Sequence, residues 1–124
     1  MAAEGLWTVQ FAKSEEDYNG LQVEEQLDRG GVFVLSGNRL LGGGLSFYFV
    51  GTYSTSGLNI EITLNATRYN DLVIGQFGAL NEARLLFKGT IDGNSMTLQG
   101  HVEDKPGNKL VIKAERRTDL NETH

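Results

Sequence analysis

LNIEITLNAT, the stretch from residue 58 to residue 67, alternates apolar and polar side chains without a break. Its apolar members are Leu58, Ile60, Ile62, Leu64 and Ala66. Because successive side chains of a β-strand point to opposite faces, this period of two predicts a strand with one dry face and one wet face.

The same alternation recurs at residues 95–103 and, with a break at Val111, at 109–117, and less regular strands lie on both sides of this stretch. We predict strands at residues 6–12, 32–35, 39–41, 46–53, 58–67, 83–91, 95–103 and 109–117. Clusters of turn-forming residues stand between strands at 36–38, 54–57, 92–94 and 105–108. Short turns join antiparallel neighbours. The chain is therefore predicted to be all-β, with about eight antiparallel strands.

Three glycines bear on how these strands assemble. Strands with one dry face each must stack as a sandwich or close as a barrel, because an open sheet would leave that face in water. Gly51, Gly89 and Gly100 fall in phase with the apolar positions of their strands. Glycine there lets a strand bend at a barrel corner, or lets a backbone or a ligand approach closely. This pattern favours a small barrel over a sandwich.

The remaining segments are expected to belong to one domain that spans residues 1–124. Residues 14–27 and 70–82 fit no strand, and each is predicted to be a loop with room for a short helical turn. Residues 42–44 are three glycines, for which we predict a turn or bulge. Residues 118–124 form a polar tail that we expect to fray.

Composition argues against several classes of function. The 124 residues include no cysteine, which removes disulfides, thiolate metal sites and thiol nucleophiles. His101 falls on the wet face of its strand, His124 lies in the tail, and no serine stands in a nucleophile-elbow pattern. We therefore expect no enzyme activity, no metal and no cofactor.

The sequence also bears on location. Its first residues lack the pattern of a signal peptide, and no stretch is long and apolar enough for a membrane span. We therefore expect a cytoplasmic protein without membrane contact.

Negative charge is concentrated in residues 14–28. This segment holds Glu15, Glu16, Asp17, Glu24, Glu25 and Asp28 and no Lys or Arg, whereas the whole chain has a net charge of −5. An acidic protein repels phosphate backbones, so we expect no direct nucleic-acid binding. The segment is either a solvated loop that aids solubility or an electrostatic docking site for a basic protein partner.

Aromatic and aliphatic side chains suggest two further sites. Tyr48 and Tyr53 are expected on the outside of their strand, either as a partner surface or covered by a loop or a second subunit. The inward side chains either form a packed core or line a cavity for a small apolar, lipid-like ligand. They are Trp7, Phe11, Phe47, Phe49, Leu85, Phe87 and Leu98.

The first and last predicted strands carry a combination of residues that is known from another barrel family. Gly5, Leu6 and Trp7 open the first strand, and Arg116 and Arg117 lie on the last. This resembles the lipocalin arrangement, in which an arginine closes the barrel over an indole. A guanidinium stacked on Trp7 would seal one end by a cation–π contact and its hydrogen bonds.

A longer match resembles the GrlR-like family, named for a negative regulator of type III secretion genes. It runs through GLWTVQF at 5–11, GVFVL at 31–35, LGG at 41–43 and FYFVGTY at 47–53, and more loosely through 64–69 and 91–100. The resemblance implies an eight-stranded lipocalin-like barrel that forms a homodimer, sequesters a transcriptional activator protein and has no enzyme activity.

The chain departs from the family pattern at two places. The family's named regulator has a run of acidic residues in the loop after the aromatic strand, where this chain has STSG at 54–57. Many members also have an aspartate after the paired glycines, at the position of Gly44. The expected function is thus a binding protein, a regulator that contacts another protein, and the alternative is a carrier of a small apolar ligand.

Overall fold

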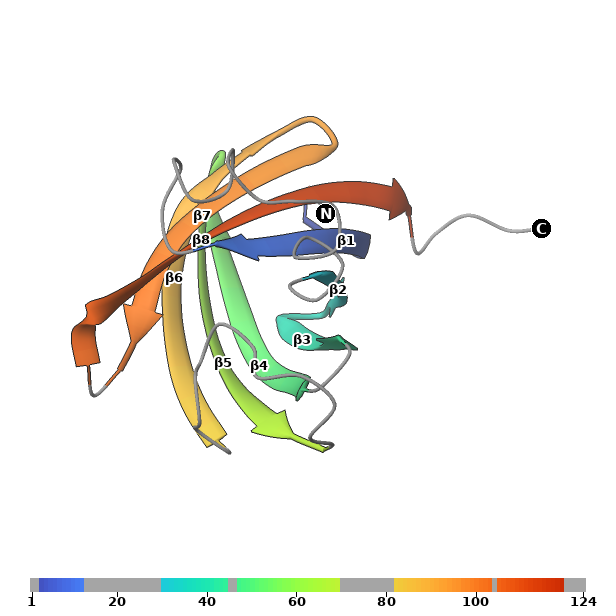
Figure 1. The fold of residues 1–124 in the computed structure, drawn as a ribbon. Helices are drawn as coiled ribbons and strands as arrows, with labels where there is room; N and C mark the ends of the chain where they lie inside the picture. The colour runs from blue at the N-terminus through green and yellow to red at the C-terminus, as the bar shows by residue number, and fades with distance from the viewer. Residues whose placement is uncertain (1–2, 13–29, 45–46, 70–81, 104, 120–124) are drawn as a thin grey trace.

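The computed structural model describes residues 3–12, 30–44, 47–69, 82–103 and 105–119. The strands are β1 (Gly5–Ala12), β2 (Gly30–Ser36), β3 (Arg39–Gly44), β4 (Phe47–Ser56), β5 (Asn59–Arg68), β6 (Glu82–Asp92), β7 (Ser95–Val102) and β8 (Lys105–Thr118). Each pairs antiparallel with its neighbours in sequence, and β1 also pairs with β8, which closes the barrel (Figure 1). The prediction of an all-β barrel of eight antiparallel strands is confirmed, and the sandwich is excluded.

Several predicted boundaries were wrong because residues typical of turns continue the strands. The glycines at 42–44 are part of β3, where Gly42 pairs with Phe33 on one side and Phe49 on the other. A Cβ on Gly42 would lie 2.0 Å from the Val32 carbonyl oxygen, so glycine serves close strand approach there and not a turn. Residues 54–56 and 105–108, also predicted as turns, belong to β4 and β8.

The observed hairpin turns are shorter than predicted. Gly37 and Asn38 connect β2 to β3 with φ of 56° and 70°, the pair of positive values that defines a type I′ turn. Gly57 and Leu58 connect β4 to β5, which removes Leu58 from the dry face predicted for it: its side chain is 66% exposed. Alternation alone does not reveal where a strand ends, so the inward face of β5 begins at Ile60.

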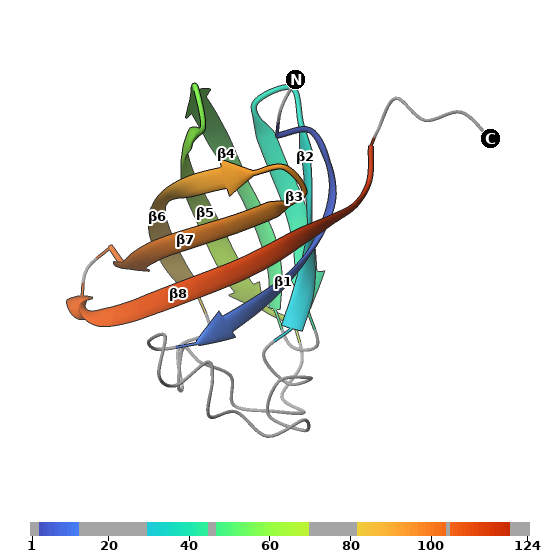
Figure 2. The same cartoon turned by 90° about the horizontal axis from the view of Figure 1, so that it is seen from above.

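The inside of the barrel holds one cluster of buried side chains to which all eight strands contribute. Seen from above, β1 lies between β2 and β8 and completes the wall around this core (Figure 2). Of the two roles considered for the in-phase glycines, strand bending and close approach, the structure shows close approach of a neighbouring backbone. A Cβ at Gly89 or Gly100 would lie 1.9 Å from a carbonyl oxygen of the neighbouring strand.

One end of the barrel is closed by Arg116 and Trp7, as the lipocalin-like combination predicted. The guanidinium carbon lies 4.9 Å from the centre of the buried indole ring. Its nitrogens donate to the carbonyl oxygens of Glu4 and Gly93, at 2.9 and 3.0 Å, and to the side-chain oxygen of Asn94 at 3.0 Å. The arginine therefore ties the chain before β1 to the turn between β6 and β7.

The neighbouring arginine has a different place. The register between β1 and β8 shifts between Leu6 and Trp7, which pair with Thr118 and Arg116 and leave Arg117 as the extra residue of a bulge. Thr118 is the last residue of β8, so the predicted tail begins later than expected. Residues 120–124 lie outside the described part of the chain, as does 14–27, where a helical turn was considered. Of the second such segment, 70–82, only Glu82 is described, and it begins β6.

Candidate functional site

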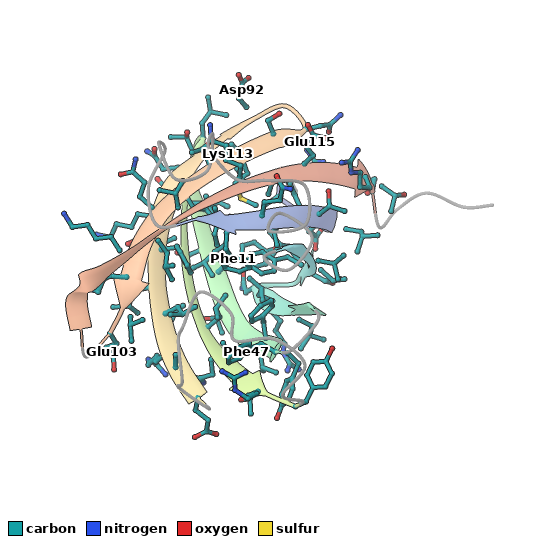
Figure 3. All side chains as sticks on the ribbon, in the orientation of Figure 1. Phe11, Phe47, Asp92, Glu103, Lys113 and Glu115 are labelled. Carbon is teal, nitrogen blue, oxygen red and sulfur yellow. The ribbon has the colours of Figure 1, made fainter. Side chains whose placement is uncertain are left out.

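The outer surface of the barrel has two halves of different chemistry. On β6 and β8, and directly after β7, charged side chains project away from the wall, among them Asp92, Lys113 and Glu115 on the strands and Glu103 after β7 (Figure 3). Phe11 and Phe47 point the other way, into the barrel. Charged side chains are typical of a solvent-exposed surface, so this half of the wall needs no protein partner to cover it.

The other half carries large apolar side chains on its outside. Val32, Leu41, Tyr48, Val50 and Tyr69 are between 38% and 55% exposed. We call these five residues the apolar outer face. Of the outward side chains on β2, β3 and β4, only that of Arg39 is charged, and it lies at the beginning of β3.

Strand register makes the apolar outer face continuous. Leu41 pairs directly with Val50, and Gly43 pairs with Val32 on one side and Tyr48 on the other. Side chains directly opposite on antiparallel strands have Cβ atoms roughly 4.5–5.5 Å apart, within contact distance. Single exposed apolar residues need no explanation, whereas an adjacent set of this kind is typical of an interaction site.

Tyr69 extends the face beyond the end of β5. Its ring centre lies 6.5 Å from that of Tyr48. Its hydroxyl donates a hydrogen bond to the carbonyl oxygen of Gly44, the last residue of β3. The two phenol rings therefore form one aromatic edge beside the strands, which the sequence analysis missed because Tyr69 follows its strand.

Tyr53 does not belong to this surface, and its predicted exposure was wrong. Its side chain is 6% exposed and lies in the core cluster. Tyr53 follows Phe47 and Phe49 at even spacing and so faces inward with them, whereas Tyr48 has the opposite parity. Counting this parity through Gly51 would have revealed the error from the sequence.

The phenol of Tyr53 is unusual for a core side chain. Its hydroxyl is buried without a hydrogen-bond partner among the described residues. Burial raises the pKa of Tyr53 above its ordinary value of 10.0; the nearby backbone of Asn38 opposes the rise, and the charge of Glu4 adds to it. The core around this group favours the neutral phenol.

The side chains predicted to line the barrel interior do point inward. Trp7, Phe11, Phe47, Phe49, Leu85, Phe87 and Leu98 are all buried members of the core cluster. The rings of Phe11, Phe33 and Phe49 pack together, with centres 5.6 to 6.3 Å apart. These three rings fill the space between them, as in an ordinary close-packed core.

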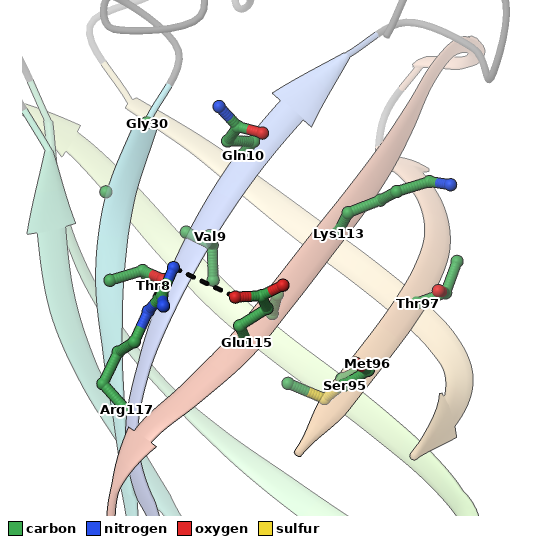
Figure 4. A pocket seen from close by; sticks show the side chains of 12 residues that line it. Thr8, Val9, Gln10, Gly30, Ser95, Met96, Thr97, Lys113, Glu115 and Arg117 are labelled. Carbon is green, nitrogen blue, oxygen red and sulfur yellow. Dashed lines mark hydrogen bonds and ion pairs between the residues drawn. The ribbon is translucent and has the colours of Figure 1, made fainter. Parts of the chain in front are cut away.

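A groove of about 690 Å³ lies on the outside of β1, β2, β7 and β8 (Figure 4). Its lining combines apolar residues, Val9, Met96 and Ala114, and the glycines Gly30 and Gly31 with seven polar or charged side chains: Thr8, Gln10, Ser95, Thr97, Lys113, Glu115 and Arg117. Arg117 pairs with Glu115 at 3.1 Å, and its Nε donates to the Thr8 hydroxyl at 2.9 Å. The groove unites four strands, so no single stretch of sequence signalled it, and its lining holds neither a histidine nor an aromatic ring.

The described residues contain no group of three or more His, Cys, Asp or Glu placed to hold a metal ion. The same ranges hold no helix long and apolar enough to cross a membrane. The six acidic residues between Glu15 and Asp28 lie outside the described part of the chain, so their predicted docking role stays a prediction.

Comparison with known proteins does not assign this chain to a family. No family model matches this chain, and no curated protein matches it. The resemblance to GrlR-like proteins stays a prediction.

Proposed function

We propose that this chain is a binding protein that acts by contact between proteins, with the apolar outer face as its contact surface. The observation that carries the proposal is the adjacency of Val32, Leu41, Tyr48 and Val50 on three neighbouring strands, exposed on the outside of the barrel and apart from its core cluster. Interface centres are depleted of charge and enriched in tyrosine, as this face is.

Folding buries these side chains only in part, so part of the free energy available from their burial is not gained in the free protein. Fully burying a Val, Leu or similar side chain contributes roughly 1.5–3 kcal/mol. Side chains that are 38% to 55% exposed leave a large share of that gain to be realised. A partner that covers the whole apolar outer face would gain this remaining free energy on binding.

The biological role that we propose follows the GrlR-like resemblance: a negative regulator that sequesters a transcriptional activator without touching DNA. The acidic residues at 14–28 support a basic partner, because concentrated charge speeds encounter and selects among proteins. We further propose, from the same resemblance, that the chain forms a homodimer.

Site-specific photocrosslinking in living cells of the source organism tests this function. A photoreactive residue at Leu41 reports on the apolar outer face, and the same residue at Gln99, exposed on the charged half, is the matched control. We expect position 41 to form an adduct with a DNA-binding regulatory protein and position 99 to form none. No adduct at position 41, or equal adducts at both positions, would refute the proposal.

A further inference from the structure

Tyr48 and Tyr69 are the exposed tyrosines of the described chain, and their rings lie side by side. The ring centres are 6.5 Å apart, and the ring planes are tilted by 39° against each other. Aromatic pairs in proteins have ring centres roughly 4.5–7 Å apart, so these two rings lie within contact range. Two phenols of the same kind therefore meet on the surface of one molecule.

Both rings are held in place by the fold. The Tyr69 hydroxyl donates a hydrogen bond to the carbonyl oxygen of Gly44, at the end of β3. Tyr48 lies in β4, which pairs with β3 on one side and with β5 on the other. Two reactants held together in this way react in an effectively unimolecular step, which is favoured over a reaction between separate molecules.

The other easily oxidised side chains that the structure describes are shielded from the solvent. Trp7 is fully buried, Met96 is 2% exposed, and Tyr53 is 6% exposed. By contrast, Tyr48 is 46% exposed and Tyr69 is 55% exposed. The chain has no cysteine that could react first. Because oxidation of a side chain increases with its exposure, a dissolved oxidant reaches this pair before the three shielded residues.

We propose that Tyr48 and Tyr69 form an oxidative modification site, at which a one-electron oxidant joins the two rings as dityrosine. The oxidant that we name is a haem peroxidase supplied with hydrogen peroxide. Each phenol loses one electron and its hydroxyl proton, and the two radicals form one carbon–carbon bond between ring positions next to the oxygens. The hydrogen on each bonded carbon moves as a proton to the oxygen of its own ring, which restores both aromatic rings. The two released electrons and two released protons reduce one hydrogen peroxide to two water molecules.

The link would join β4 to the residue that follows β5, at the edge of the apolar outer face. It goes beyond the proposed function and does not depend on it, because it concerns only the reactivity of two neighbouring phenols.

Brief oxidation of the purified full chain at low protein concentration tests this site. The chain has four tyrosines, so single phenylalanine variants identify both partners of a crosslink. We expect wild type to gain the blue fluorescence of dityrosine and to keep the size of a single chain on a denaturing gel. Mass spectrometry of its fragments should find residues 48 and 69 joined, with the mass of two hydrogen atoms lost. Tyr48→Phe and Tyr69→Phe should each lower the yield of this link at least tenfold.

Tyr53→Phe and Tyr18→Phe are the matched controls, and each should keep the wild-type yield within twofold. Circular dichroism before oxidation checks that every variant is folded, and the fragment map of wild type decides the linked positions even if one variant is not. No dityrosine, a link that uses Tyr18 or Tyr53 instead, or a link that forms only between two chains and increases with protein concentration would overturn the inference.

Discussion

Arg116 and Arg117 are adjacent in sequence and have opposite roles in the structure. Arg116 stacks on the buried ring of Trp7 and donates three hydrogen bonds, two of them to backbone carbonyl oxygens. Arg117 is half exposed and pairs with Glu115 on the surface. A planar guanidinium presents several donors in a fixed geometry that an ammonium group cannot reproduce.

We therefore expect Arg116→Lys to lower the free energy of unfolding by about 1–3 kcal/mol, because hydrogen bonds and ring stacking are lost together. Arg117→Lys is the matched control and should change it by no more than about 0.5 kcal/mol. Denaturant unfolding measures both. Equal effects of the two substitutions would contradict the role assigned to Arg116.

Two neighbouring glycines should differ as sharply in their tolerance of a methyl group. Gly42→Ala places a Cβ 2.0 Å from a carbonyl oxygen, so it should cost about 3 kcal/mol or more or prevent folding. Gly43→Ala meets its nearest atom at 3.3 Å and should change stability by no more than about 1 kcal/mol. Thermal unfolding of the two variants decides, and equal destabilisation would contradict the register of β3.

Tyr53 should make the free energy of unfolding depend on pH above pH 10. The pKa of its buried phenol is raised above 10.0 in the folded chain, so below pH 10 the full stability is present. As the pH rises past 10, the unfolded chain releases this proton first, and stability falls until the folded-state pKa is reached. Tyr53→Phe should lose less stability above pH 10 than wild type, as followed by chemical denaturation at each pH.

The same substitution carries a second expectation at neutral pH. Because the Tyr53 hydroxyl is buried without a partner among the described residues, Tyr53→Phe should leave the protein as stable or raise its stability by up to about 1 kcal/mol. A loss of more than about 1 kcal/mol would show that the hydroxyl is satisfied in solution.

At the scale of strands, side-chain parity and strand length are predicted with unequal success. Inward positions such as Ile60, Ile62 and Leu64 follow from alternation, since neighbouring side chains of any strand point to opposite faces. Strand ends do not follow, since glycines at 42–44 are equally typical of a turn and of two closely packed strands. The exposed Leu58 shows the same ambiguity at the start of β5.

The apolar outer face should be dispensable for the fold and required for binding. Leu41→Lys combined with Val50→Lys places two charges on paired, exposed positions of β3 and β4, so we expect a stability change within about 1 kcal/mol. Partner capture should fall at least tenfold. Thr90→Lys with Gln99→Lys adds the same charge to the other half and should leave capture unchanged, as measured by affinity purification with quantitative mass spectrometry.

At the scale of the whole molecule, closure determines which surfaces are available for binding. Every described strand has a partner on both sides, so no strand edge is left to pair with another chain. Binding must therefore use side chains of the outer wall, the ends of the barrel or its interior. The packed rings of Phe11, Phe33 and Phe49 favour the outer wall over the interior.

Native mass spectrometry checks this choice on the intact protein. Because the three rings occupy the space between them, we expect the purified chain to appear at its own mass or twice that mass, with no bound lipid. A small apolar molecule retained in proportion to the protein would favour the carrier of an apolar ligand, the alternative raised by the sequence, and would count against the proposed regulator.

By itself, the sequence determined the all-β class and most of the inward side chains, because alternation and short turns are local properties of the chain. The stacking of an arginine on Trp7 was expected from the resemblance to lipocalins. Only the tertiary structure decided that Val32, Gly43 and Tyr48 lie in one row. They come from three strands, and their alignment depends on two registers that turn lengths and barrel closure set together. A contact surface of this kind is visible only when those registers are known.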